Sequence, residues 1–196
     1  MKKTAKKIGQ KSLALRLKDT VDAVAEQLEG VFAISPKDIV AAVKEDHRAL
    51  RNYLGTLKDT EQDMTDRRRA YAGFSALLKS HTVAEEKAVY APTTKLAGRE
   101  MHIKVAEGFV EHKLAEDIMK RLERATDPLA WSAHANVLAE IVEHHLKEEE
   151  KSLLPLIRKA ATATENAAML DKFMALRAAS QKRVTAKNAG VLKTKA

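Results

Sequence analysis

The strongest constraint on this 196-residue chain is an internal repeat of histidine and glutamate residues. His47 is followed 34 residues later by His81, and His112 is followed 33 residues later by His145. In both halves the second histidine starts the sequence His-x-x-x-Glu-Glu-Lys, and a proline closes the half. Two similar halves of this length predict one helical hairpin used twice, with the two hairpins facing each other.

Turn-forming residues are rare, which favours long helices. The chain has 7 glycines and 4 prolines, and apolar residues recur every three or four positions, as on one face of a helix. The short connections predict antiparallel neighbours. We therefore expect an all-α fold: an antiparallel four-helix bundle with an extra amphipathic helix at each end. The expected helices cover about 13–34, 36–62, 66–91, 97–125, 128–160 and 164–180.

Two helix starts carry a specific signal. Ser35-Pro36 and Asp127-Pro128 each place a good N-cap residue before a proline, and proline is favoured in the first turn of a helix. These pairs predict that the first and fourth bundle helices begin at Pro36 and Pro128.

Positive charge is concentrated at the two ends of the chain. The net charge is +8; residues 1–12 carry five lysines, and residues 177–196 carry six basic residues, with no acid in either segment. The tails are either solvated ends or contacts to nucleic acid or an anionic membrane surface. The flanking helices either pack on their own bundle or form a homodimer. The expected parts are a basic tail (1–12), a flanking helix (13–34), the bundle (36–160), a C-terminal flanking helix (161–180) and a basic tail (181–196).

Cysteine is absent, so disulfides, thiolate metal sites and iron–sulfur clusters are excluded. A transition metal would have to use imidazole and carboxylate ligands, as iron, manganese and zinc do. No apolar run approaches the ~18 residues of a membrane-spanning helix. Charged residues interrupt the stretch after the basic N-terminus, so we expect no secretory signal and a cytoplasmic protein.

The repeated histidines fall on the apolar faces of their helices. At 100° per residue, His81 and Glu85 lie within about 20° of the centre of their apolar stripe, and so do His145 and Glu149. A carboxylate in an apolar core is very costly unless it is paired or binds a metal. One core histidine is usually part of ordinary packing, but two such His–Glu pairs favour a metal site.

The remaining two helices add further candidates. His112 lies in the middle of the third stripe, while His47 lies at the edge of the first, at about 40°. Glu116, one turn beyond His112, is about 60° to one side. The sequence thus predicts a buried two-metal site between the helices, with the ligands His47, His81, Glu85, His112, Glu116, His145 and Glu149.

Other polar residues near these positions have weaker assignments. Asp46 and Glu111 each precede a candidate histidine, and we expect them to face solvent or to contact a ligand from outside. The three tyrosines, Tyr53, Tyr71 and Tyr90, are candidate hydrogen-bond donors near the site.

At these positions the chain resembles the hemerythrin-like, or HHE cation-binding, family over about residues 36–160. The similarity lies in Asp46-His47, His81-x-x-x-Glu85-Glu86, Glu111-His112 and His145-x-x-x-Glu149-Glu150 followed by Leu154-Pro155. The resemblance implies a non-haem di-iron site in a four-helix bundle, with the four histidines as terminal ligands. It also implies that Glu85 and Glu149 bridge the two irons. Zinc and manganese remain alternative metals.

The chain differs from the oxygen-carrier branch of that family, which has His-x-x-x-His on its third helix and His-x-x-x-x-Asp on its fourth. Here Gly108 and Glu116 flank His112, and Glu149 follows His145 after four residues. With Glu116 included, the ligands would be four imidazoles and three carboxylates. Such a hard, anionic set favours ferric iron and disfavours simple reversible oxygen carriage.

Three functions remain open from the sequence. The first is a di-iron protein that binds or senses oxygen, nitric oxide, peroxide or iron. The second is a di-iron oxidase or peroxidase-type enzyme at the same site. The third is an interaction protein with a structural metal, whose basic tails contact nucleic acid or a membrane. The first is the leading interpretation, so we expect a binding or sensing protein rather than an enzyme.

Overall fold

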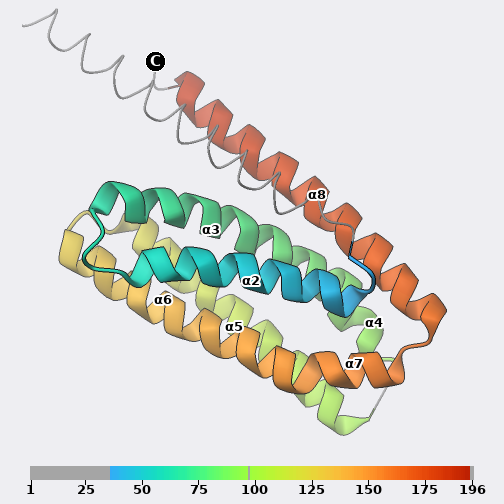
Figure 1. The fold of residues 1–196 in the computed structure, drawn as a ribbon. Coiled ribbons are helices and arrows are strands. Elements are labelled where there is room, and N and C mark those ends of the chain that lie inside the picture. Colours follow the sequence, from blue (N-terminus) through green and yellow to red (C-terminus); the bar gives the residue numbers. More distant parts are fainter. Residues whose placement is uncertain (1–35, 97, 195–196) are drawn as a thin grey trace, which may run out of the picture.

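The computed structural model describes residues 36–96 and 98–194, with side chains described as far as residue 183. These residues form helices and short connections and contain no strand. The expected all-helical fold is therefore confirmed for the described part of the chain (Figure 1). The elements are α2 (Ile39–Lys58), α3 (Met64–Glu85), η1 (Glu86–Tyr90), α4 (Ala91–Thr93), α5 (Arg99–Arg124), α6 (Pro128–Glu148), η2 (Glu149–Leu153), α7 (Leu154–Ala160) and α8 (Ala163–Thr194).

Four long helices lie side by side. Helix α2 packs against α3 and α6, and α6 packs against α5. Helix α8 packs along α3 and also touches α2 and η1, so it adds a further layer on the α3 side (Figure 1). The second hairpin, α5 with α6, therefore faces the first, α2 with α3, as the internal repeat predicted.

The helix starts follow ordinary capping chemistry. Asp127 caps α6 by accepting a hydrogen bond from the backbone N–H of Ala130 at 2.8 Å, and Pro128 is the first helical residue. This confirms the predicted start of the fourth helix. Helix α2 begins at Ile39 instead of Pro36, because Asp38 is the cap and accepts from Ala41 at 2.7 Å. An aspartate three residues before a free N–H satisfies one of the helix's unpaired donors.

Two short π-helical turns, η1 and η2, interrupt the second helix of each hairpin. Each begins six residues before a proline, Pro92 or Pro155. A proline lacks the N–H that would close a normal helical turn, and a wider turn lets the helix continue past it. The expectation that the second helix ends before Pro92 is therefore wrong, since helical backbone continues to Thr93.

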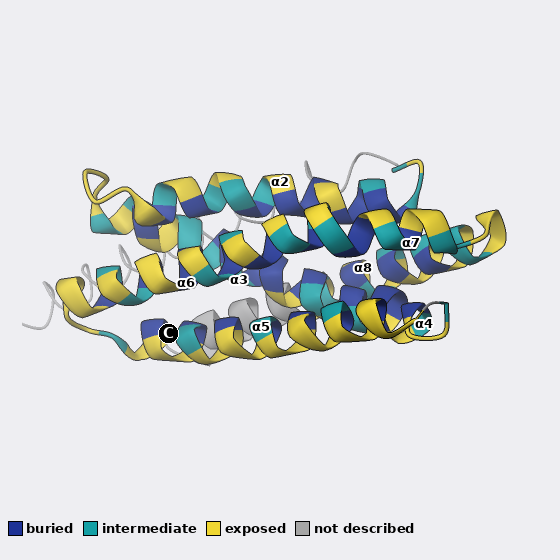
Figure 2. Cartoon of the chain, turned by 90° about the horizontal axis from the view of Figure 1, so that it is seen from below, coloured by how far each residue is buried: buried dark blue, intermediate teal, exposed yellow. Residues whose placement is uncertain are grey.

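The hydrophobic core consists of two clusters at opposite ends of the helices. One surrounds Phe74 and Trp131, and the other surrounds Tyr90, Met101 and Phe173. Figure 2 shows the buried residues along the inner faces of the helices. The candidate site residues occupy the stretch between the two clusters, where apolar side chains give way to polar ones.

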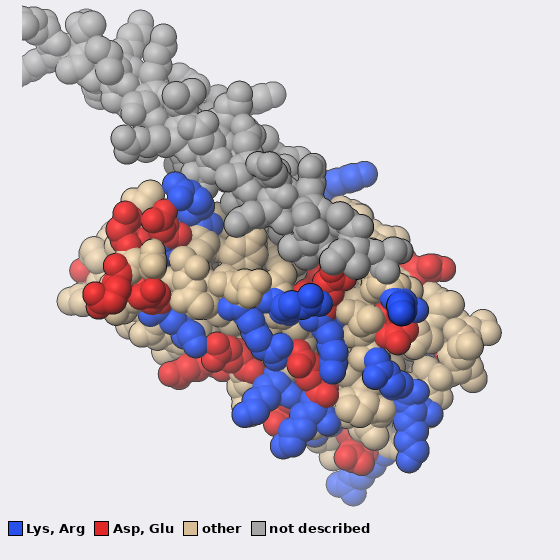
Figure 3. Space-filling model, viewed as in Figure 1, with Lys and Arg blue, Asp and Glu red and all other residues tan. Residues whose placement is uncertain are grey.

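The described surface carries charges of both signs. Figure 3 shows acidic and basic side chains interspersed over the face in view. Among the described residues, no helix is long and apolar enough to cross a membrane. The expected helix at 13–34 and the basic segment 1–12 lie outside the described residues. Helix α8 extends to Thr194, beyond the expected end near residue 180.

Candidate metal centre

Four histidines and two glutamates meet between the two hairpins. The Nε2 atoms of His81 and His112 lie 3.3 Å and 3.4 Å from Oε2 of Glu85. Those of His47 and His145 lie 3.3 Å and 3.5 Å from Oε2 of Glu149. Each glutamate therefore joins a histidine of its own helix to one from the opposite hairpin.

The six side chains form two overlapping groups in which ligand atoms lie within 4.8 Å of one another. One group is His47, His81, Glu85 and Glu149, and the other is Glu85, His112 and His145. Glu85 belongs to both groups, and Glu149 also reaches His145 at 3.5 Å. This arrangement can hold two cations that share the carboxylates of the two glutamates.

All six side chains are buried, and several of their polar atoms lack partners. His47, His81 and Glu85 are 0% exposed, and the least buried of the six, His112, is 7% exposed. Among the described residues, Nε2 of His47 and His81, both carboxylate oxygens of Glu85 and Oε2 of Glu149 accept or donate no hydrogen bond. Buried polar groups are normally satisfied, so these inward-facing atoms fit a centre that binds cations.

The outer nitrogen of each histidine contacts an acidic residue. The Nδ1 distances are 2.9 Å from His47 to Glu150, 3.2 Å from His81 to Asp46, 2.9 Å from His112 to Glu86 and 2.8 Å from His145 to Glu111. Because a carboxylate only accepts, Nδ1 donates, which leaves Nε2 as the nitrogen that can bind a cation once its proton is lost. Such partners fix the orientation of ligand histidines and increase their basicity as ligands.

These outer contacts repeat the twofold pattern of the sequence. The residue before the first histidine of a hairpin, Asp46 or Glu111, binds the second histidine of the same hairpin. The residue after the inner glutamate, Glu86 or Glu150, binds the first histidine of the other hairpin. Sequence reasoning missed the latter two roles, although the repeated Glu-Glu pair was a signal for them.

The structure does not bring Glu116 to the centre. Its side chain is 50% exposed and lies 2.8 Å from both Lys113 and Lys120. These ammonium groups lower the pKa of Glu116 on the helix surface. The angle of about 60° from the apolar stripe turns the carboxylate toward solvent, so the expectation that it is a ligand is not supported.

The charges of the centre raise the pKa values of His47, His81 and His112 and lower that of Glu85. Burial lowers the pKa of His81, but the charges of Glu85 and Asp46 outweigh burial and raise it to about 10. The pKa of His112 is likewise lowered by burial but raised overall to about 9 by Glu85 and Glu86. Burial raises the pKa of Glu85, yet His81 and His112 hold it well below its usual value. A metal ligand must be deprotonated, so a bound cation would replace these protons.

A family comparison agrees with this geometry. The model of the hemerythrin HHE cation-binding domain matches residues 38–157, which contain all six inner side chains. The chain belongs to this family. A search of curated proteins and a search of solved structures each gave no significant match.

Tyr90 adds a buried phenol to the inner side chains of this HHE domain. Its hydroxyl donates a hydrogen bond to Oε1 of Glu149, and its ring stacks on His112 at 5.5 Å. Gly108 provides the space, because a Cβ there would lie 2.8 Å from Cζ of Tyr90. A phenol therefore fills the space beside His112 on its Gly108 side. Tyr71, by contrast, binds Glu123 and the Met119 carbonyl away from the centre.

Helix α8 covers the His81 side of this HHE domain. The Phe173 ring lies 6.0 Å from the His81 ring in an edge-on contact. Arg177, 1% exposed, places Nη1 3.3 Å from Oδ1 of Asp46, the residue that contacts His81. Residues beyond the family match thus support the centre, and sequence reasoning assigned them no role.

Proposed function

We propose that the protein holds two iron ions bridged by Glu85 and Glu149, and that it binds or senses oxygen, nitric oxide or peroxide there. His47 and His81 would be terminal ligands of one ion, and His112 and His145 those of the other. The observation that supports this proposal is the buried set of four imidazoles and two carboxylates, five of whose inward-facing atoms make no hydrogen bond.

Iron fits this set better than the other candidate metals. Imidazole and carboxylate suit iron, zinc and manganese, but structural zinc sites are usually closed tetrahedra of four ligands. Two overlapping groups that share carboxylates are instead typical of di-iron bundle proteins. With Glu116 outside, the set is less anionic than the sequence indicated.

Tyr90 adds a buried phenol to the proposed centre. Its hydroxyl is a buried hydrogen-bond donor beside the centre, where it orients Glu149. The Tyr90 proton is donated to Glu149, so the role that we propose for Tyr90 is to hold this bridging carboxylate in place.

We also propose a domain arrangement. Residues 36–160 would form the antiparallel four-helix metal-binding unit, and 161–180 would be a flanking helix that closes it. A second flanking helix at 13–34 and basic segments at 1–12 and 181–196 complete the proposal.

Metal analysis and optical spectroscopy test the proposed function. The protein is purified without chelator, and its iron, zinc and manganese are quantified. Spectra are then recorded under nitrogen, oxygen and nitric oxide. About two irons per chain, as expected for the two ligand groups, with spectra that respond to the added gas, would support the proposal. Stoichiometric zinc with no response would indicate a structural site, and folded protein that binds no metal would reject the metal centre.

A further inference from the structure

We propose that the groove between α5 and α6 is the route by which divalent cations reach the metal centre. In this route Glu107, Glu111 and Glu148 would bind each cation transiently. The ammonium of Lys104 would occupy the position between these carboxylates until a cation displaces it. The inference rests on the proposed metal centre and adds how that centre is filled.

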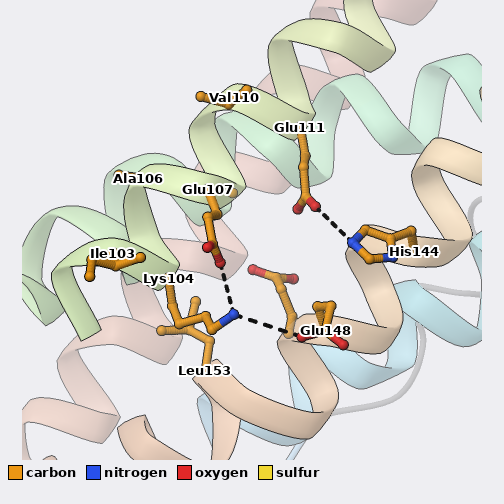
Figure 4. A pocket seen from close by; sticks show the side chains of 11 residues that line it. Ile103, Lys104, Ala106, Glu107, Val110, Glu111, His144, Glu148 and Leu153 are labelled. Carbon is orange, nitrogen blue, oxygen red and sulfur yellow. Dashed lines mark hydrogen bonds and ion pairs between the residues drawn. The ribbon is translucent and has the colours of Figure 1, made fainter. Parts of the chain in front are cut away.

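The groove is a real cavity at the protein surface, with a volume of about 610 Å³. Helix α5 contributes Glu107 and Glu111 to its walls, and α6 contributes His144 and Glu148. Figure 4 shows these side chains pointing toward one another across the space between the two helices. Carboxylates on both walls are a suitable lining for a hydrated divalent cation, which prefers oxygen ligands.

The groove ends at atoms of the metal centre. Glu149 lines it and is only 4% exposed, and its Oε2 has no hydrogen-bond partner among the described residues. That oxygen lies 3.3 Å from His47 and 3.5 Å from His145. Gly108 also lines the groove, and the Tyr90 ring beside it donates a hydrogen bond to the other carboxylate oxygen of Glu149. A cation that passes between the walls therefore meets a buried carboxylate oxygen that accepts no hydrogen bond.

Lys104 occupies the position expected for a cation in transit. Its ammonium lies 2.8 Å from Glu107 and 3.8 Å from Glu148, so it joins the two walls (Figure 4). Four glutamates and one lysine line the groove, which leaves a net negative charge. A cleft lined by one sign of charge concentrates ions of the opposite sign, and an arriving divalent cation can displace the single ammonium.

Two other sides of the described centre are unfavourable for a cation. A second cavity reaches Glu150, but Lys44, Arg158 and Lys159 line it. On the α8 side, Phe173 covers His81 and the guanidinium of Arg177 lies beside Asp46. Among the cavities described, the α5–α6 groove combines a negative lining with contact to an inner ligand.

Stopped-flow uptake of Co²⁺ by metal-free protein tests this route, because Co²⁺ bound to imidazole and carboxylate absorbs visible light. The double variant Glu107→Gln/Glu148→Gln should slow uptake about tenfold or more, the lower end of electrostatic steering effects. Lys104→Met should accelerate it. The final amount of bound Co²⁺ should equal that of the unchanged protein in both cases.

Matched controls lie on the same helix outside the groove. The double variant Glu116→Gln/Asp117→Asn and the single variant Lys113→Met make the same charge changes in exposed ion pairs of α5, and uptake rates should stay unchanged. Equal rates in groove and control variants, at unchanged stoichiometry, would overturn the route while leaving the metal centre intact. If the double variant bound less Co²⁺ at equilibrium, Glu107 and Glu148 would be ligands of the centre itself. That result would also overturn the proposed route. No binding by the unchanged protein would reject both proposals.

Discussion

The outer ring nitrogen of each candidate ligand histidine is held by an acidic residue, while the inner nitrogen faces the centre. The outer Nδ1 faces an acidic residue at 2.8–3.2 Å, while the inner Nε2 faces Glu85 or Glu149 at 3.3–3.5 Å. The Nδ1–carboxylate distances are those of hydrogen bonds, and the Nε2–carboxylate distances are longer. Such an arrangement orients the rings before a cation binds, because rotation of a ring would break its outer hydrogen bond.

Two glutamates with the same local sequence should behave oppositely. Glu85 and Glu116 each follow a histidine after four residues, but Glu85 is buried in the centre and Glu116 is paired with lysines on the surface. Glu85→Gln should weaken metal binding by more than tenfold, since even partners outside the ligand set typically contribute roughly tenfold or more. Glu116→Gln should leave binding unchanged. Equilibrium dialysis with Fe²⁺ under nitrogen measures both, and equal effects would contradict the assignment.

The stability of the metal-free protein should depend on pH in a defined direction. Because the folded pKa of His81 is raised to about 10 and that of His112 to about 9, their contribution is fully present below their unfolded value near 6.5. It should be lost progressively as the pH rises toward 10. The pKa of Glu150 is lowered to about 2, mainly by His47 and Arg51, so its contribution should be lost as the pH falls from about 4.5.

Urea unfolding in the presence of chelator, followed from pH 3 to pH 10.5, measures this dependence. The free energy of unfolding should be highest between about pH 5 and pH 7. A value that rose steadily between pH 7 and pH 10 would contradict the raised histidine pKa values.

At the scale of elements, the prolines and π-turns explain what sequence periodicity could not. A regular 3.6-residue period placed His81, Glu85, His145 and Glu149 on one face correctly, because all four precede or begin the π-turns. Beyond the π-turn the helical period changes, so the direction of the Tyr90 side chain could not be calculated from 100° per residue. The contact of Tyr90 with Glu149 depends on this change and on the close approach of α5 at Gly108.

Two glycine substitutions test that close approach. In Gly108→Ala the new Cβ would overlap the Tyr90 hydroxyl, and overpacking typically costs about 1–3 kcal/mol, against a gain of at most about 1 kcal/mol in helix propensity. The variant should be destabilised and its metal affinity lowered. Gly55→Ala in α2, where a Cβ meets nothing within 4 Å, should gain about 0.5–1 kcal/mol. Thermal unfolding distinguishes them, and stabilisation of both would contradict the role of Gly108.

Helix α8 should contribute to stability through the buried ion pair between Arg177 and Asp46. Arg177→Met leaves the carboxylate of Asp46 buried without its guanidinium neighbour, and such losses typically cost about 3–5 kcal/mol. The matched control is Arg158→Met, which breaks the exposed pair with Asp38 and should cost about 1 kcal/mol or less. Similar urea midpoints for the two variants would mean that α8 does not support the centre in this way.

At the scale of the whole molecule, the polar centre separates two hydrophobic clusters. The histidines of α2 and α3 follow one cluster and precede the other along each helix, as His47 does between Val43 and Leu50. Cations at this position would connect all four helices. A metal that binds only the folded state should add about 3–4 kcal/mol at 100–1,000 times its dissociation constant. Calorimetry with and without chelator measures this gain, and an unchanged midpoint would contradict it.

The sequence predicted the helices and six inner side chains because both depend on local periodicity. It placed Glu116 wrongly, although Lys113 and Lys120, three and four residues away, favoured a surface ion pair. The roles of Glu86, Glu150 and Arg177 depend on contacts between different helices. The periodicity of a single helix does not predict contacts with another helix.

The most direct test of the metal centre is a crystal structure of iron-loaded protein, with anomalous diffraction measured above the iron absorption edge. Two strong peaks are predicted between the hairpins, one beside His47 and His81 and one beside His112 and His145, with Glu85 and Glu149 contacting both. A single peak, peaks at Glu116 or elsewhere on the surface, or no peak in loaded crystals would contradict the account.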